Sequence, residues 1–205
     1  IDLRSDTVTI PTPKMKEAMM NALLGDDGYG DDPTVNELER LAAETLGKED
    51  ALFVPSGTFG NQLAIYTHCK QGDEVILSDD GHIIMYEQGA AAIISRVNLR
   101  PVKATLGVMD PNDIEAKIRK DLDDPACPFT GLIIVENPSG AGCLIPLENL
   151  AKIREIGKKY NVPIHMDGAR IFSAAAGLGV SPREVAKHAD TVMFCLSKNL
   201  CAPIG

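Results

Sequence analysis

Short apolar runs recur along the chain, and in each of them the apolar residues are nearly continuous. Continuous runs indicate strands that are buried on both faces of a parallel sheet. Amphipathic helical stretches at 112–120 and 147–160 separate the later runs. The pattern therefore predicts an α/β fold, a mostly parallel sheet covered by helices. The runs occupy residues 51–54, 74–77, 92–94, 132–135, 162–166 and 191–196.

A helix is expected to open near residue 34, before the first of these runs. Thr34 and Glu37 have the T-x-x-E spacing of a capping box, apolar residues follow at helical spacing, and Gly47 is a stop signal. The preceding stretch is rich in proline, glycine and aspartate and predicts an N-terminal arm with a long polar loop. We therefore divide the chain into an arm and loop, 1–32, and a large domain, 33–205.

Composition excludes two classes of partner. The chain has 20 Lys and Arg against 29 Asp and Glu, a formal net charge of −9, which argues against nucleic acid. No apolar run approaches the ~18 residues that a membrane span needs. The five cysteines form no C-x-x-C pair and no signal-like segment leads the chain, so we expect a reduced, cytoplasmic protein with no metal cluster.

Reactive side chains follow the apolar runs. Ligands of an open α/β sheet bind outside the carboxyl ends of its strands, so these positions are the candidate site. The residues in question are Ser56, Gly57 and Thr58 after the first run, His82 after the second, Glu136 and Asn137 after 132–135, Asp167 and Arg170 after 162–166, and Lys198 after the last.

Each of these residues has a functional and a plain structural interpretation. The 56–58 turn leads into a helix and is either an anion site or only a turn. For Lys198 the two interpretations are a desolvated lysine that forms a Schiff base and an ordinary exposed lysine. Asp167 pairs with a pyridinium N–H or caps a helix. His82 stacks on an aromatic cofactor or satisfies a loop, and Arg170 binds a carboxylate or phenolic oxygen or forms a surface salt bridge.

Taken together, a phosphate turn, a histidine, an aspartate and a lysine in this order match the needs of pyridoxal 5′-phosphate (PLP). At the level of segments, the chain resembles the low-specificity L-threonine aldolase family of fold-type I PLP enzymes. The segments that carry the resemblance are 2–9, 25–33, 53–58, His82 with 86–90, 165–170 and 194–198.

The resemblance implies a role for each matching residue. Lys198 would hold PLP as a Schiff base, Asp167 would pair with the pyridine nitrogen, and His82 would stack on the ring. Ser56, Gly57 and Thr58 would hold the phosphate, with Arg170 near the cofactor. Ser5, Tyr86 and Arg170 would contact the substrate, and Tyr29 would reach a neighbouring site of a homotetramer built from dimers.

The implied reaction is retro-aldol cleavage of L-threonine or L-allo-threonine, small amino-acid substrates, to glycine and acetaldehyde, without a metal. The chain departs from the family in two places that bear on this reaction. The stretch 123–129 lacks the histidine expected near the substrate hydroxyl, and Glu136-Asn137 continues as Pro138-Ser139-Gly140 rather than Thr-His. We therefore take His82, or a water that it holds, as the candidate base.

The chain also stops seven residues after Lys198, whereas enzymes of this kind continue into a C-terminal small domain. We therefore expect the chain to be part of a longer protein. Two other functions stay open. One is a different PLP-dependent lyase, racemase or aminotransferase of the same fold, and the other is a non-catalytic fragment.

Overall fold

The computed structural model describes residues 2–121 and 123–205. The chain forms two compact units. The first runs to Gly57 and resumes from Cys195 to Gly205, and the second comprises Thr58–Phe194. Each unit is described by itself. The boundary between arm and large domain expected at residue 32 stays a prediction.

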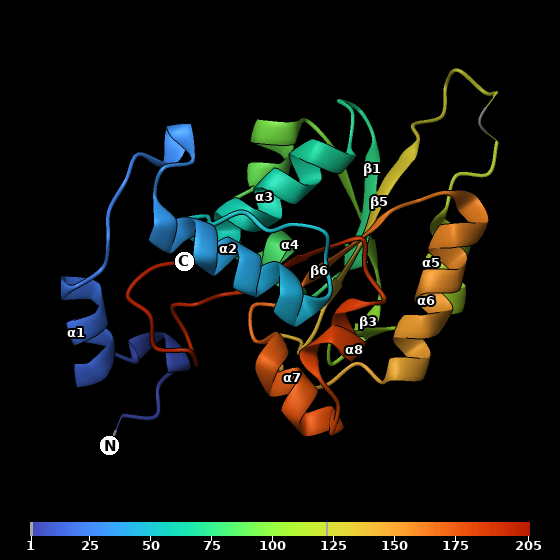
Figure 1. Ribbon diagram of the computed structural model, residues 1–205. Helices are drawn as coiled ribbons and strands as arrows, with labels where there is room; N and C mark the ends of the chain where they lie inside the picture. Colours follow the sequence, from blue (N-terminus) through green and yellow to red (C-terminus); the bar gives the residue numbers. More distant parts are fainter. Residues whose placement is uncertain (1, 122) are drawn as a thin grey trace. The chain divides into compact units, whose positions relative to one another are not determined.

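The second unit is built on a parallel sheet whose strand order is β2-β1-β5-β6-β7 (Figure 1). Every pairing in this sheet is parallel, which confirms the fold class expected from the continuous apolar runs. The strands are β1 (Glu74–Ser78), β2 (Asn98–Val102), β5 (Thr130–Glu136), β6 (Ile164–Asp167) and β7 (Thr191–Met193).

Helices cover the sheet, and α5 and α6 lie to one side of it with α3 to the other (Figure 1). Helix α6 matches the predicted range, and it buries Leu150, Ile153 and Ile156 at helical spacing. The helices of this unit are α3 (Gly57–His68), α4 (His82–Tyr86), α5 (Pro111–Lys117), α6 (Leu147–Tyr160), α7 (Ile171–Leu178) and α8 (Pro182–Ala186), and a small hairpin joins β3 (Ala104–Thr105) to β4 (Val108–Met109).

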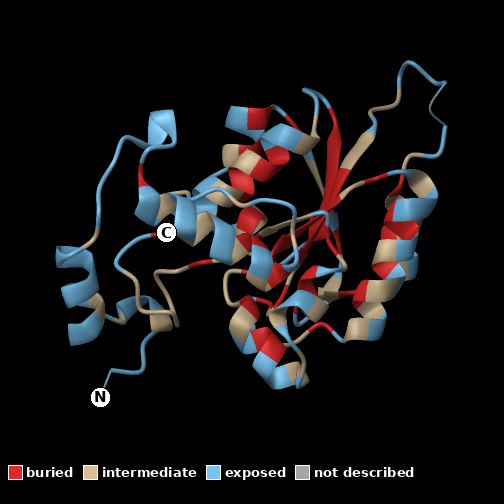
Figure 2. Cartoon of the chain, viewed as in Figure 1, coloured by how far each residue is buried: buried red, intermediate tan, exposed pale blue. Residues whose placement is uncertain are grey.

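The core of this unit lies on the sheet (Figure 2). All residues of β1 and β6 are buried, and the central residues of β5 are buried as well. Aliphatic side chains such as Val75, Leu132 and Ile164 are almost completely excluded from solvent. The unit therefore positions the last residue of each strand on a rigid, close-packed support.

Two of the predicted strands are absent. Residues 51–54 form no strand, and Leu52 and Phe53 are exposed. Residues 92–94 lie in a short π-helix, Ala91–Ser95, which leaves Ile93 and Ile94 exposed. The strand beside β1 is instead β2, whose apolar pattern is interrupted by Pro101. Proline is tolerated there because β2 is the edge of the sheet.

The first unit contains η1 (Asp6–Val8), α1 (Pro13–Met20), η2 (Asp27–Tyr29) and α2 (Pro33–Leu46). The expected capping box is wrong, because Asp32 caps α2 and Thr34 lies inside the helix. The Asp32 carboxylate accepts hydrogen bonds from the backbone N–H groups of Thr34 and Val35. Gly47 does end the helix, with a φ of 67°.

The first unit also joins segments that are distant in sequence. The backbone N–H of Leu196 donates to the carbonyl oxygen of Gly205 over 3.1 Å, and the N–H of Gly205 donates to the carbonyl of Pro55 over 3.3 Å. The loop that carries Lys198 is thereby tied to the segment that precedes α3. Among the described residues, no helix is both long and apolar enough to cross a membrane.

Candidate active site

Two carboxylates end neighbouring strands at the carboxyl edge of the sheet. Glu136 is the last residue of β5 and Asp167 the last of β6, and the register pairs them side by side. Asp167 is buried and Glu136 is partly buried. The pKa of Glu136 is raised, first by burial and then by the negative charge of Asp167. Glu136 and Asp167, two of the polar residues expected at this edge, therefore lie side by side.

Asp167 is held by two nitrogen donors. Its Oδ2 accepts a hydrogen bond of 2.8 Å from Nδ2 of Asn61 in α3, and its Oδ1 accepts one of 3.1 Å from the backbone N–H of Ala169. A buried carboxylate is costly unless donors compensate its charge. These two hydrogen bonds fix the orientation of the Asp167 carboxylate.

Glu87 is a second buried carboxylate, with a side chain that is 0% exposed. Its Oε1 accepts from Nδ2 of Asn61 and lies 2.9 Å from Nδ1 of His82, while its Oε2 accepts from Nε2 of Gln62 over 2.6 Å. Glu87 therefore joins α3 to α4 and, through Asn61, shares a donor group with Asp167.

His82 begins α4 and is fixed at two points. Its backbone N–H donates to Oε2 of Glu136 over 2.7 Å, and its Nδ1 is engaged by Glu87. The hydrogen bond to Glu87 is the main cause that raises the pKa of His82 above its ordinary value. The Tyr86 ring lies 5.6 Å away, centroid to centroid. Because Glu87 occupies Nδ1, Nε2 is the ring nitrogen left to act on a ligand.

The other predicted site residues of the second unit lie on helix ends. Thr58 is exposed in the first turn of α3, directly after Gly57. Arg170 is the N-cap of α7 and follows Asp167 by three residues. Tyr86 is exposed at the end of α4. The structure thus brings His82 and Asp167 into one hydrogen-bonded cluster, and the Tyr86 ring lies beside the His82 ring of that cluster.

The remaining predicted residues belong to the first unit: Ser5, Tyr29, Ser56, Gly57 and Lys198. The Ser5 hydroxyl accepts from the Thr7 backbone and hydroxyl and so caps η1. Tyr29 is highly exposed in η2. The carbonyl oxygen of Lys198 accepts a hydrogen bond of 2.6 Å from the Thr9 hydroxyl, which fixes the lysine backbone to the N-terminal segment.

Sequence reasoning assigned no role to Asn61, Gln62 or Glu87. Asn61 and Gln62 are buried polar residues in an otherwise apolar part of α3, and Glu87 is a buried carboxylate after α4. Buried polar residues of this kind require partners, so polar breaks in an apolar helix were the available signal. This signal does not identify the partners of Asn61 and Gln62, because the contacts join residues far apart in sequence.

No metal cluster was expected from the sequence. Among the described residues, ligand atoms of His82, Glu87 and Asp167 lie within 4.8 Å of one another. The hydrogen bonds that Asn61 and His82 make with the two carboxylates account for this proximity.

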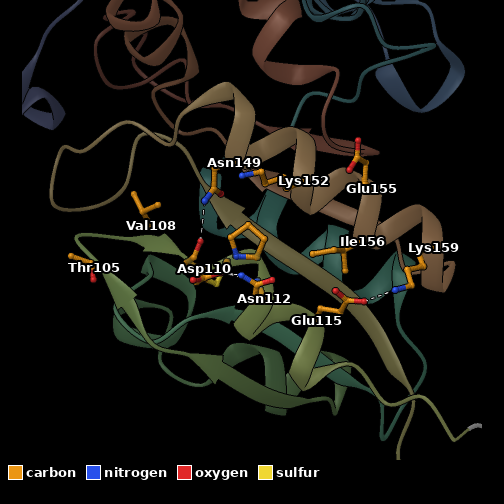
Figure 3. A pocket seen from close by; sticks show the side chains of 12 residues that line it. Thr105, Val108, Asp110, Asn112, Glu115, Asn149, Lys152, Glu155, Ile156 and Lys159 are labelled. Atoms are coloured by element: carbon orange, nitrogen blue, oxygen red, sulfur yellow. Dashed lines mark hydrogen bonds and ion pairs between the residues drawn. The ribbon is translucent and has the colours of Figure 1, made fainter.

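A separate cavity of about 830 Å³ lies between the β3–β4 hairpin, the start of α5 and one face of α6 (Figure 3). Its lining mixes both charges, and Lys159 pairs with Glu115 across one end over 2.7 Å. None of the predicted site residues is among the described residues that line it. The cavity is therefore distinct from the carboxylate cluster.

The profile of the family described as "Beta-eliminating lyase" matches residues 2–205. A low-specificity L-threonine aldolase of Arabidopsis thaliana is 48% identical over 210 residues, covering 100% of this chain and 58% of the relative. The low specificity L-threonine aldolase of Escherichia coli is 42% identical over 206 residues, covering 100% of this chain and 61% of the relative. The chain thus spans about three fifths of these relatives.

Solved structures share the fold. A Leishmania major threonine aldolase superposes with a TM-score of 0.78 at 24% identity, covering 94% of this chain and 57% of the other. A cysteine desulfurase from Thermococcus onnurineus superposes with a TM-score of 0.67 at 20% identity, covering 98% and 50%. At these identities the likeness concerns the fold alone, and one fold carries different reactions.

Proposed function

Because this chain belongs to the beta-eliminating lyase family, we propose that its protein is a PLP-dependent aldolase that cleaves L-threonine and L-allo-threonine to glycine and acetaldehyde. The curated relatives named low-specificity L-threonine aldolase support this proposal. The structural observation that carries it is the buried, doubly hydrogen-bonded Asp167 at the carboxyl end of β6, joined to His82 through Asn61 and Glu87.

The donor set fits the cofactor. A buried carboxylate that is held by N–H donors is the partner that a protonated pyridine nitrogen needs, and Asp167 supplies it. When bound, PLP supplies an electron sink for the charge that develops as the Cα–Cβ bond breaks. Lys198 would hold the cofactor covalently through Nζ, and Ser56, Gly57 and Thr58 would bind its phosphate at the start of α3.

His82 would act as the general base of the proposed reaction. Glu87 engages Nδ1 of the ring, so a neutral His82 donates Nδ1–H to Glu87 and presents an unprotonated Nε2. That Nε2 can take the proton of the substrate hydroxyl, and Glu87 then stabilises the imidazolium. This role suits a chain whose 123–129 segment contains no histidine.

Arg170 and Ser5 would bind the substrate carboxylate, Arg170 through its planar guanidinium. Tyr86, next to His82, would contact the substrate as well. By resemblance, Tyr29, which is highly exposed, would reach a neighbouring site of a homotetramer built from dimers. The five cysteines are free thiols, which supports a cytoplasmic protein.

Borohydride reduction tests the cofactor assignment. The full-length protein, incubated with PLP and reduced, should carry one cofactor mass on the peptide that contains Lys198, and the Lys198→Ala protein should carry none. Lys187→Ala is a matched control that should label like the wild type, because Lys187 pairs with Glu184 at the surface. Labelling of the Lys198→Ala protein at the wild-type level would refute the assignment.

A product panel tests the reaction. L-threonine and L-allo-threonine should release acetaldehyde and glycine in equal amounts, measured with alcohol dehydrogenase and by amino-acid analysis. Pyruvate or ammonia release from L-serine, or formation of D-amino acids, would instead identify an eliminating lyase or a racemase. Either product appearing without acetaldehyde would overturn the aldolase proposal.

A further inference from the structure

A line of hydrogen bonds leads from His68 through Thr191 and His165 to Asn61, which donates to Asp167. His165 precedes Asp167 by two residues on β6 and is 1% exposed. The register places Thr191 of β7 directly beside it. His68, at the end of α3, is only partly buried. All these residues belong to the second unit.

The contacts are continuous. Nε2 of His68 lies 2.9 Å from the Thr191 hydroxyl, and the same hydroxyl lies 2.9 Å from Nδ1 of His165. Nε2 of His165 lies 3.1 Å from Oδ1 of Asn61. The Nδ2 group of Asn61 then donates to both Asp167 and Glu87. Each link has the length of an ordinary hydrogen bond.

The two carboxylates fix the direction of every link. Carboxylate oxygens accept, so the hydrogens of Asn61 must point to them and its Oδ1 must be an acceptor. His165 must therefore carry a proton on Nε2. Burial lowers the pKa of His165 to about 3, so the ring is neutral and its Nδ1 accepts from the Thr191 hydroxyl. The Thr191 oxygen in turn accepts from an Nε2–H of His68.

We propose that His165, Thr191 and His68 are positioning residues, forming a neutral hydrogen-bond chain of fixed direction that locks the Asn61 amide with its NH2 group toward Asp167 and Glu87. A flipped Asn61 would turn its oxygen toward two carboxylates and leave Nε2–H of His165 facing an N–H group. Both changes replace attraction by repulsion. The chain thus holds the orientation of Asp167 from the same face of the sheet, two residues earlier on β6.

The consequence for the cofactor rests on the proposed function. If Asp167 binds the pyridine nitrogen, the orientation set by Asn61 determines how well it does so. A break in the chain at Thr191, which lies outside the cofactor residues, should therefore weaken PLP binding without removing any group that touches the cofactor.

The first experiment reads the proton positions in the cofactor-free, full-length protein. Long-range 1H–15N correlation spectra of histidine-labelled protein at pH 7.5 distinguish the two neutral tautomers, with His165→Gln and His68→Gln proteins to assign the signals. Both His165 and His68 should be neutral with the proton on Nε2. A proton on Nδ1 of His165, or a charged His165, would overturn the proposal whether or not the protein binds PLP.

The second experiment uses a matched pair at Thr191. Thr191→Val keeps the shape and removes the hydroxyl, while Thr191→Ser keeps the hydroxyl. The valine variant leaves both Nδ1 of His165 and Nε2–H of His68 without their partner, so it should show mixed tautomers at His165. It should bind PLP about tenfold more weakly, which corresponds to about a tenth of the molecules keeping the competent Asn61 orientation. The serine variant should match the wild type in both measurements.

Equal PLP affinities of the valine and serine variants would contradict the positioning role. Should the valine variant fail to fold, the wild-type tautomers and the serine variant still decide the matter. Absence of PLP binding by the wild type would refute the proposed function and leave the tautomer test of the chain intact.

Discussion

Replacing Glu87 by glutamine removes the charge at the centre of the carboxylate cluster and changes little else. Glu87 accepts from Asn61, Gln62 and His82 at 2.6–2.9 Å. Hydrogen bonds to a charged group contribute about 1 kcal/mol more than neutral ones. Gln62 can turn its amide to accept from the new NH2 group, because its own Oε1 is buried without a partner in the described part of the chain.

We therefore expect Glu87→Gln to lower the free energy of unfolding by about 2–3 kcal/mol, from three weakened hydrogen bonds. The assay is urea unfolding of the cofactor-free, full-length protein. Glu115→Gln is the matched control, because the Glu115 carboxylate pairs with Lys159 and Tyr160 at the surface. That control should lose less than about 1 kcal/mol.

The same substitution should change the titration of His82. Its pKa is raised chiefly by the hydrogen bond to Glu87, so the pKa measured by NMR should fall toward 6.5 in the Glu87→Gln protein and stay raised in the control. An unfolding free energy no lower than that of Glu115→Gln, together with an unchanged His82 pKa, would refute the view that Glu87 organises the cluster.

Three further substitutions test other parts of the structure. Asp32→Ala should lower the free energy of unfolding by about 1–2 kcal/mol, because it removes the cap of α2, whereas Thr34→Val should lower it less. A larger loss in Thr34→Val would support the capping box at Thr34 instead. Glu74→Gln should cost about 2 kcal/mol at pH 7, because the carboxylate is shared by two arginines. Those arginines lower the pKa of Glu74, so its contribution is complete above 4.5 and is lost as the pH falls through the lowered value. Urea unfolding from pH 3 to 7 should therefore show the two proteins converging in acid, and a constant difference would contradict this. In His82→Asn protein that is saturated with PLP, acetaldehyde release should be slower by at least about a hundredfold, and an unchanged rate would show that His82 is not the base.

The sequence predicts the central strands and α6 well, because their signals are local. The buried runs that became β1, β5 and β6 depend on continuous apolar residues, and α6 depends on apolar spacing over a long segment. The run at 92–94 has the same composition as a strand. It forms a π-helix with Ile93 and Ile94 exposed, and a short apolar run alone does not distinguish a strand from a helical turn.

The candidate site, too, is predictable from the sequence only where its signals are local. Strand ends identify His82 and Asp167, since the carboxyl edge of a parallel sheet collects them. The groups that hold them come from α3 and from the end of α4, and no local pattern relates Asn61 to Asp167 across more than a hundred residues. Contacts of that kind depend on how the helices pack on the sheet, which periodicity does not specify.

The order of the strands also governs when these contacts can form during folding. β1 pairs with β5, and β7 is the edge strand that pairs with β6, so each of these pairings needs a long crossover to close. Parallel pairings of this range fold slowly, because loop closure costs entropy before contacts compensate it. Thr191 lies on this edge strand, so the link from His68 to His165 needs β7 to be paired with β6. The proton on Nε2 of His165 should accordingly exchange with solvent only when this edge opens, which makes it a reporter of the local opening of β7.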